Sequence, residues 1–152
     1  MCTSFMGELL TATHNFGASP IRAATTADTF KAALYLTSAT INAATTAYTA
    51  TGEVTGTNYS AGGVTVTNAT APLSTNSSAT AGVAYWTPSA SITYTTVTLS
   101  TAFDTVLIYN STQSNKSVSV HTFGSQTITA GTFTLTMPSN TTSTALLRLA
   151  TT

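Results

Sequence analysis

The stretch that decides the fold runs Asp104-Thr-Val-Leu-Ile-Tyr-Asn110 and then, after a polar loop, Lys116-Ser-Val-Ser-Val-His-Thr-Phe-Gly124. The first segment is an apolar block, and the second alternates between two sets of side chains with a period of two, as β-strands do. Gly131-Thr-Phe-Thr-Leu-Thr-Met-Pro138 alternates again, and the apolar run Ala145-Leu-Leu-Arg-Leu-Ala150 follows it. The pattern predicts four short strands joined by tight connections in the last third of the chain.

Further strands are predicted upstream, over residues 30–36, 48–54, 64–68, 83–86 and 91–99. In the last of them the alternation changes phase between Tyr94 and Val97, which indicates a β-bulge at that point. About eight or nine strands without alternating helical segments are typical of an all-β protein. We therefore expect an antiparallel β-sandwich, jelly-roll-like in its connections.

The segment before the first strand has a helical pattern instead. We expect residues 1–27 to form a short N-terminal helix or arm with a linker, and residues 28–152 to form the single β-sandwich domain. Ser4 can cap a helix whose Phe5 and Leu9 are four residues apart. So short a helix is stable only when it is docked, either as a lid over one end of the sandwich or as an arm on a neighbouring subunit. The predicted partner contacts of such an arm are its apolar side chains: Phe5, Met6, Leu9, Leu10 and Phe16.

Charge is scarce in this chain. Only 5% of the 152 residues are charged, whereas about 25% are charged in an ordinary soluble domain. Four basic and four acidic side chains cancel, and four scattered cations cannot form the clustered footprint that nucleic acid or anionic lipid requires. We therefore expect no nucleic acid partner and no membrane partner. Near-neutral surfaces promote association, and threonine-rich strand edges without lysine or proline are open to pairing, which favours a place inside an assembly.

Cysteine usage and the chain start bear on the cellular compartment. Cys2 is the only cysteine, so no internal disulfide can form and a reducing compartment of synthesis is expected. The N-terminal sequence lacks the basic and apolar regions of a signal peptide. No stretch approaches the roughly 18 apolar residues of a membrane-spanning helix.

The side chains that usually carry catalysis or bind metals are few and scattered. Neither His14 nor His121 has an acidic neighbour within a few residues, and His121 is expected to be a hydrogen-bonded structural histidine. The four acids are isolated from one another in the sequence: Glu8, Asp28, Glu53 and Asp104. The spacings typical of zinc sites, EF-hands, serine nucleophiles and phosphate loops are absent. We therefore expect no enzymatic activity, no catalytic residue, no metal and no cofactor.

Three aromatic residues leave two interpretations open. Tyr85, Trp86 and Tyr94 can line a sugar-binding surface, which would make the chain a carbohydrate-binding module. Residues of this type also fill the cores of β-sandwiches, and that is their commoner role. Burial of the rings separates the two interpretations, because stacking on a sugar needs an open ring face.

Six stretches spread over nearly the whole chain share their residue order with one known family. They are Ser-Phe…Glu-Leu-Leu…His-Asn-Phe (4–16), Asp-Thr-Phe-Lys-Ala-Ala-Leu-Tyr (28–35), Thr-Ala-Tyr-Thr-Ala-Thr-Gly-Glu-Val (46–54), Tyr-Ser-Ala-Gly-Gly (59–63), Leu-Ile-Tyr-Asn (107–110) and Phe-Thr-Leu-Thr-Met-Pro (133–138). In this order they resemble a family of small virion structural proteins encoded by tailed bacteriophages, many of them phages of aquatic bacteria. The most specific block runs from residue 28 to residue 54, and the threonine-rich segment 91–101 departs from the family pattern.

The resemblance implies a particle component without enzymatic activity, located in the virion and assembled in the cytoplasm of the bacterial host. One interpretation is a capsid decoration (cement) protein that clamps neighbouring major capsid subunits, with a trimer as the favoured homo-oligomer. The other is a neck, tail or fibre protein. The implied partners are accordingly the major capsid protein or other virion proteins.

Overall fold

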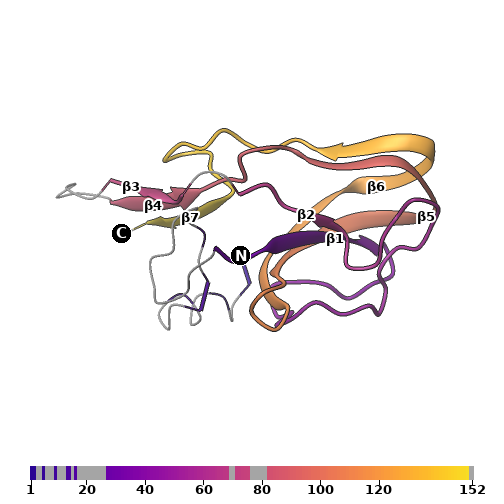
Figure 1. Ribbon diagram of the computed structural model, residues 1–152, viewed down its shortest axis with the longest axis horizontal. Coiled ribbons are helices and arrows are strands. Elements are labelled where there is room, and N and C mark those ends of the chain that lie inside the picture. The colour runs from indigo at the N-terminus through magenta and orange to yellow at the C-terminus, as the bar shows by residue number, and fades with distance from the viewer. Residues whose placement is uncertain are drawn as a thin grey trace.

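The computed structural model describes residues 1, 2, 5, 9, 13, 14, 16, 27–68, 71–75 and 82–150. This part of the chain is all-β and forms two antiparallel sheets, an arrangement consistent with a β-sandwich, as predicted (Figure 1). The strands are β1 (Phe30–Leu36), β2 (Val64–Thr65), β3 (Leu73–Ser74), β4 (Val83–Trp86), β5 (Ile92–Asn110), β6 (Lys116–Leu135) and β7 (Leu147–Ala150). The four-stranded sheet has the order β2-β1-β5-β6, and the three-stranded sheet has the order β3-β4-β7. None of the helical structure within the described ranges is long and apolar enough to cross a membrane.

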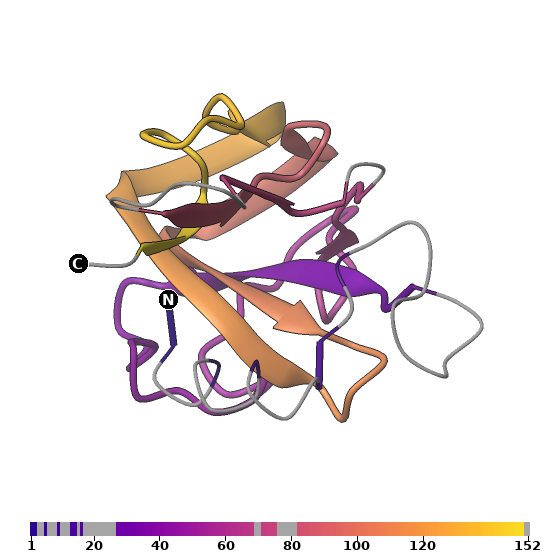
Figure 2. The same cartoon turned by 90° about the vertical axis from the view of Figure 1, so that its left-hand side faces the viewer.

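The long hairpin of β5 and β6 builds most of the molecule. These strands are 19 and 20 residues long, and both bend so that the outer half of the hairpin lies over the half next to its turn (Figures 1 and 2). The pairing is irregular between Leu99 and Thr105 of β5, and irregular pairing of this kind bends strands. Across the bend, the ring of Phe103 packs edge-on against that of Phe133, with 5.1 Å between the ring centroids. One hairpin therefore supplies two facing layers.

This bend corrects one expectation about the strands. The sequence predicts separate strands over 91–99, 104–110, 116–124 and 131–138, but β5 and β6 each continue through the supposed connection, with irregular pairing there. The segments between them, residues 100–103 and 125–130, contain none of the glycine, proline or asparagine residues that end strands. The four predicted strands are therefore observed as two.

The β-bulge predicted inside 91–99 is present. Tyr94 pairs with Phe133 and Val97 pairs with Gly131, so β5 carries one extra residue between them. Thr96, within this bulge, has a φ angle of 54°, a conformation that few non-glycine residues adopt. The bulge turns Val97 onto the buried side that Tyr94 already occupies, and both side chains lie in the core.

Two other predicted strands differ from the structure. Residues 48–54 do not form a strand. Two isolated bridges, from Ala47 to Lys116 and from Glu53 to Tyr35, pair this region with the sheet. The predicted strand 64–68 is shortened to β2. Conversely, β3 lies in a stretch whose serine, threonine and asparagine content predicts a loop. Its pairing with β4 supplies the hydrogen bonds that hold it extended.

The core occupies both faces of β1. Phe30, Ala32 and Leu34 point into the main cluster between the layers, whereas Ala33 and Tyr35 point into a second cluster with residues of β5. This alternation follows the two faces that the sequence pattern assigns to residues 30–36. The rings of the main cluster include Phe5, Phe16, Phe30, Trp86, Tyr94 and Phe103.

Gly63 is required where β2 meets β1. Its φ angle is +72°, and a Cβ atom at this position would lie 1.7 Å from the carbonyl oxygen of Ala32. We expect Gly63→Ala to lower the free energy of unfolding by at least about 2 kcal/mol, because the backbone conformation and the contact with β1 both become strained. Urea denaturation monitored by fluorescence measures the change.

Gly124→Ala is the matched control, since a Cβ atom there meets nothing within 4 Å. We expect the free energy of unfolding to change by less than about 0.5 kcal/mol in this variant. Equal effects of the two substitutions would contradict the close approach of Gly63 to β1.

Candidate functional site: an apolar groove

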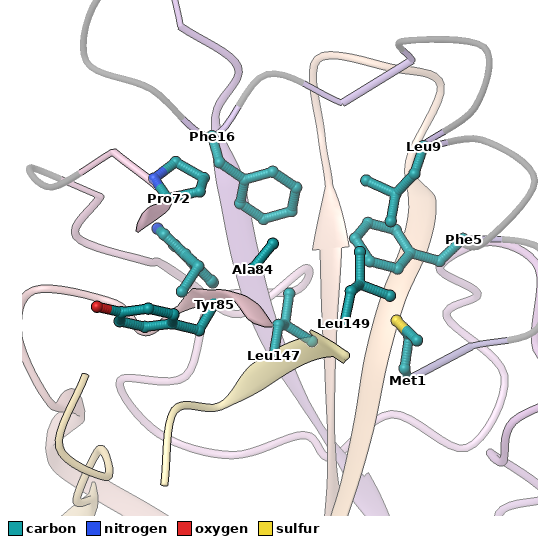
Figure 3. Close-up of a pocket in the computed structure, with 10 residues that line it drawn as sticks. Met1, Phe5, Leu9, Phe16, Pro72, Ala84, Tyr85, Leu147 and Leu149 are labelled. Atoms are coloured by element: carbon teal, nitrogen blue, oxygen red, sulfur yellow. The ribbon is translucent and has the colours of Figure 1, made fainter. Parts of the chain in front are cut away.

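An apolar groove lies between the three-stranded sheet and the N-terminal segment (Figure 3). Phe5, Leu9 and Phe16 face it from one side, and Leu147 and Leu149 of β7 face it from the other (Figure 3). Its volume is about 80 Å³. The complete lining, which we call the apolar groove from here on, is Met1, Phe5, Leu9, Phe16, Pro72, Ala84, Tyr85, Trp86, Leu147 and Leu149.

Strand pairing produces the floor and the rim of the apolar groove. Trp86 pairs with Leu147, and Ala84 pairs with Leu149, so these four side chains share one face of the sheet. The floor is buried, because Trp86 packs against Phe16 with 4.8 Å between ring centroids. The rim is open: Leu149 is 44% exposed and Met1 is 41% exposed. The groove thus offers apolar surface to the solvent above a filled core.

The predicted partner contacts fall on this groove where the structure describes them. Phe5 and Phe16 are 2% and 6% exposed, and Leu9 is half-buried; all three line the groove. Phe5 and Leu9 are helical, as the sequence predicts, while Met6 and Leu10 lie outside the described residues. These three side chains pack on the sandwich of their own chain, as expected of a lid. Contact of the same segment with a neighbouring subunit stays a prediction.

A buried polar cluster holds the N-terminal segment to the hairpin turn. The side-chain amide nitrogen of Asn110 donates a hydrogen bond to Asp28 Oδ2 at 2.8 Å and lies 3.0 Å from His14 Nδ1. Gln113 donates to the other carboxylate oxygen of Asp28 at 3.0 Å. All three members of the His14–Asn110–Asp28 group are less than a tenth exposed. The amide of Asn110 neither gains nor loses a proton at ordinary pH, so its part in the cluster is to position the two side chains.

Sequence reasoning missed this cluster. His14 has no acidic neighbour along the chain, yet folding brings it to the same amide as Asp28. Asn110 is 82 residues from Asp28 and 96 residues from His14. No local spacing signals a contact over such distances. The one available hint was the polar Asn110 at the end of an otherwise apolar strand.

A second buried carboxylate is surrounded by tyrosines. Glu53 Oε1 accepts hydrogen bonds from the Tyr59 hydroxyl and the Gly62 N–H, both at 2.8 Å, and Oε2 accepts one from the Tyr48 hydroxyl at 2.7 Å. The Tyr109 hydroxyl donates to the carbonyl oxygen of Gly62 at 2.8 Å. Both carboxylate oxygens are thereby engaged. Glu53 fixes the segment 48–63 on the four-stranded sheet.

Trp86, Tyr94 and His121, which the sequence analysis also singled out, are buried or hydrogen-bonded within the fold. Trp86 and Tyr94 are buried in the core, so neither ring has an open face for stacking on a sugar. The indole N–H of Trp86 donates to Asn68 Oδ1 at 3.0 Å. His121 Nε2 lies 3.0 Å from Ser119 Oγ, and burial lowers the pKa of His121, with the positive N-terminus adding to the effect.

Neither metal chemistry nor a known relative points to another site. Within the described residues, no group of three or more histidine, cysteine, aspartate or glutamate side chains could hold a metal ion. In comparisons with protein-family models, curated proteins and solved structures, the chain matches none. The apolar groove is the feature on which we base a functional inference, because it combines a buried floor with an exposed apolar rim.

The tyrosines around Glu53 make stability sensitive to alkaline pH. Burial raises the pKa of both Tyr48 and Tyr109 to about 12 from the usual 10.0, and the charge of Glu53 adds to the effect on each. Burial likewise raises the pKa of Tyr35, Tyr59 and Tyr94 above the usual value. A raised pKa in the folded state means that the protonated phenols favour folding. Their contribution is complete below pH 10 and is lost as the pH rises through about 12.

We therefore expect the free energy of unfolding to fall as the pH is raised above 10. Tyrosinate absorbance should appear later on the pH scale in the native protein than in the protein unfolded in denaturant. Native and unfolded titrations that coincide would contradict the buried tyrosine cluster.

Proposed function

We propose that the protein is a non-enzymatic structural component of a bacteriophage virion, a capsid decoration protein that clamps neighbouring major capsid subunits. The observation that carries the proposal is the apolar groove with its exposed rim on a chain of which only 5% of residues are charged. Two of the four acids, Asp28 and Glu53, are buried and serve internal networks. The resemblance of six stretches to small virion proteins supports the same assignment.

The occupant of the groove in this proposal is an apolar side chain of the major capsid protein. The volume of about 80 Å³ is smaller than the roughly 150 Å³ that accommodates benzene in an engineered protein cavity, so one aliphatic side chain fills it. Burying one such side chain contributes about 1.5–3 kcal/mol, which is too little for stable binding alone. Several copies acting together multiply weak contacts, and the proposed homo-oligomer, a trimer, supplies them.

A jelly-roll-like sandwich is the finer fold that accompanies this function. Its support is the bend of the long hairpin: with each of β5 and β6 counted as two strands, the seven strands become nine. Jelly-roll sandwiches of this kind occur in viral capsid domains.

Loss of the protein tests the location and role. We expect virions without it to lose resistance to heat and osmotic shock, and added protein to restore it. Unchanged resistance would contradict a clamp.

A neck, tail or fibre protein predicts instead few copies confined to one site of the particle, and cryo-electron microscopy of the virion distinguishes this from many copies over the capsid.

Leu149 and Leu73, two leucines of similar exposure, test whether docking uses the apolar groove. Leu149 is 44% exposed on the rim, and Leu73 of the same sheet is 46% exposed but does not line the groove. We expect Leu149→Asp to abolish the restoring effect of the added protein, because a carboxylate at the rim must be desolvated on docking. Leu73→Asp should restore stability like the unmodified protein. Equal behaviour of the two variants would show that docking does not use the groove.

A further inference from the structure

Strand β6 is an edge strand without the usual protection against pairing. It lies at one side of the four-stranded sheet, and the sequence from Ser117 to Met137 contains no Asp, Glu, Lys, Arg or proline. Edge strands of natural proteins commonly carry charges, prolines or bulges that prevent another strand from adding to them. Of these three devices, β6 has bulges but neither charges nor prolines over Ser117–Met137.

Other parts of the chain cover one end of this edge. The backbone N–H of Cys2 donates to the carbonyl oxygen of Val118 at 3.0 Å, and the N–H of Ser117 donates to Thr46. Between Ser119 and Leu135, no backbone hydrogen bond from outside the β5–β6 hairpin reaches β6 in the part of the chain that the structure describes. Among the residues that the structure describes, none pairs with the outer half of the edge.

The bulges leave one regular stretch in this unpaired half. Pairing is irregular around residues 122–126, and Ala130 has a φ angle of 47°. From Gly131 to Leu135, the strand is extended; Phe133, Thr134 and Leu135 pair in order with Tyr94, Thr93 and Ile92. We call Gly131–Leu135 the open edge. Its Thr132 and Thr134 are exposed, while Phe133 and Leu135 are half-buried on the inner side.

Apolar surface lies beside the open edge. A cleft of about 200 Å³ separates the two halves of the folded hairpin, and Leu135 and Met137 line it together with Ile92 and Phe123. A strand added to the open edge extends the layer that forms one wall of this cleft. Pairing would therefore add apolar contact to the new backbone hydrogen bonds.

We propose that the open edge pairs antiparallel with the open edge of a second copy of this chain, about a two-fold axis at Phe133. In this register Thr132 of each copy faces Thr134 of the other. The chain already contains this kind of pair, because Thr93 and Thr134 face each other on β5 and β6 with 3.4 Å between their hydroxyl oxygens. Two identical edges bring no like charges together, so an uncharged edge is complementary to itself.

The contact is weak on its own. Five paired residues bury far less than the roughly 1,200 Å² of a standard stable interface, so association requires high protein concentration or a surface that aligns many copies. The inference does not depend on the proposed function, because it concerns the isolated protein. A two-fold contact does not build a trimer; it links two subunits, or two trimers, side by side.

Charge pairs at the two exposed threonines provide the test, with the masses of all proteins measured by sedimentation equilibrium up to near-millimolar concentration. At low concentration the unmodified protein should have the mass of its smallest species. As the concentration increases, the measured mass should rise towards twice that value. Thr132→Asp with Thr134→Asp, and Thr132→Lys with Thr134→Lys, each place two like-charged pairs across the axis and should weaken association about tenfold. Thr132→Lys with Thr134→Asp places two opposite-charged pairs there and should associate as well as the unmodified protein.

All positions changed are exposed, so the free energy of unfolding of each double variant, measured alongside, should stay within about 1 kcal/mol of the unmodified value. Three results would overturn the proposal. One is an unmodified protein whose mass does not rise with concentration. Another is equal association of all four proteins. The third is a Lys–Asp variant as weak as the two like-charged variants, because the register then is wrong.

Discussion

The fold depends on the packing of a single hairpin against itself. Phe103 is completely buried at the bend, where its ring meets Phe133 of the outer half at 5.1 Å and Phe123 of the turn half at 5.9 Å between centroids. Burial of rings of this size is among the largest favourable contributions that one side chain can make. Without it, two strands of about twenty residues would extend into water as an isolated ribbon, which is only marginally stable. The bend converts that ribbon into two layers.

The remaining elements attach to this folded hairpin. Along its whole length, Phe30 to Leu36, β1 pairs with the half of β5 next to the turn. β2 pairs with the other edge of β1. The hydroxyl of Tyr94, from the outer half, donates to the carbonyl oxygen of Ala32 at 2.8 Å and so ties the second layer to β1. The N-terminal residues then close one end through Phe5 and Phe16. The apolar groove exists only because these pieces meet there.

The local part of this architecture could be predicted from the sequence, and the long-range part could not. Alternating segments and short apolar runs predicted β1, β4 and most of β5 and β6, and a phase change predicted the bulge near Thr96. The bend could not be predicted, because the residues between the predicted strands, 100–103 and 125–130, include no glycine or proline. The segment 48–54 alternates like a strand, but it does not form one. The hydrogen bonds that Glu53 accepts from Tyr48 and Tyr59 fix it in a non-strand conformation instead. A buried carboxylate has no signature in a single sequence.

One wall of the apolar groove could be predicted from the sequence, and the other wall could not. Apolar spacing singled out Phe5, Leu9 and Phe16, and all three line the groove. The opposite wall comes from β4 and β7, whose register places Leu149 beside Ala84. The sequence gives no measure of that register, because it depends on how the chain between the two strands folds. The His14–Asn110–Asp28 cluster is likewise a product of tertiary structure alone.

The placement of β1 has a kinetic consequence. This strand is apolar on both faces, yet its partner β5 is made much later in synthesis; Asp28 and Asn110, at the end of that pairing, are 82 residues apart. The hairpin, by contrast, is closed by the short turn at 111–115, so its loop-closure entropy is small. Contacts between distant residues form slowly, so the apolar faces of β1 stay exposed to solvent until β5 pairs with it. A growing chain of this kind is therefore most prone to aggregate before β5 has emerged from the ribosome.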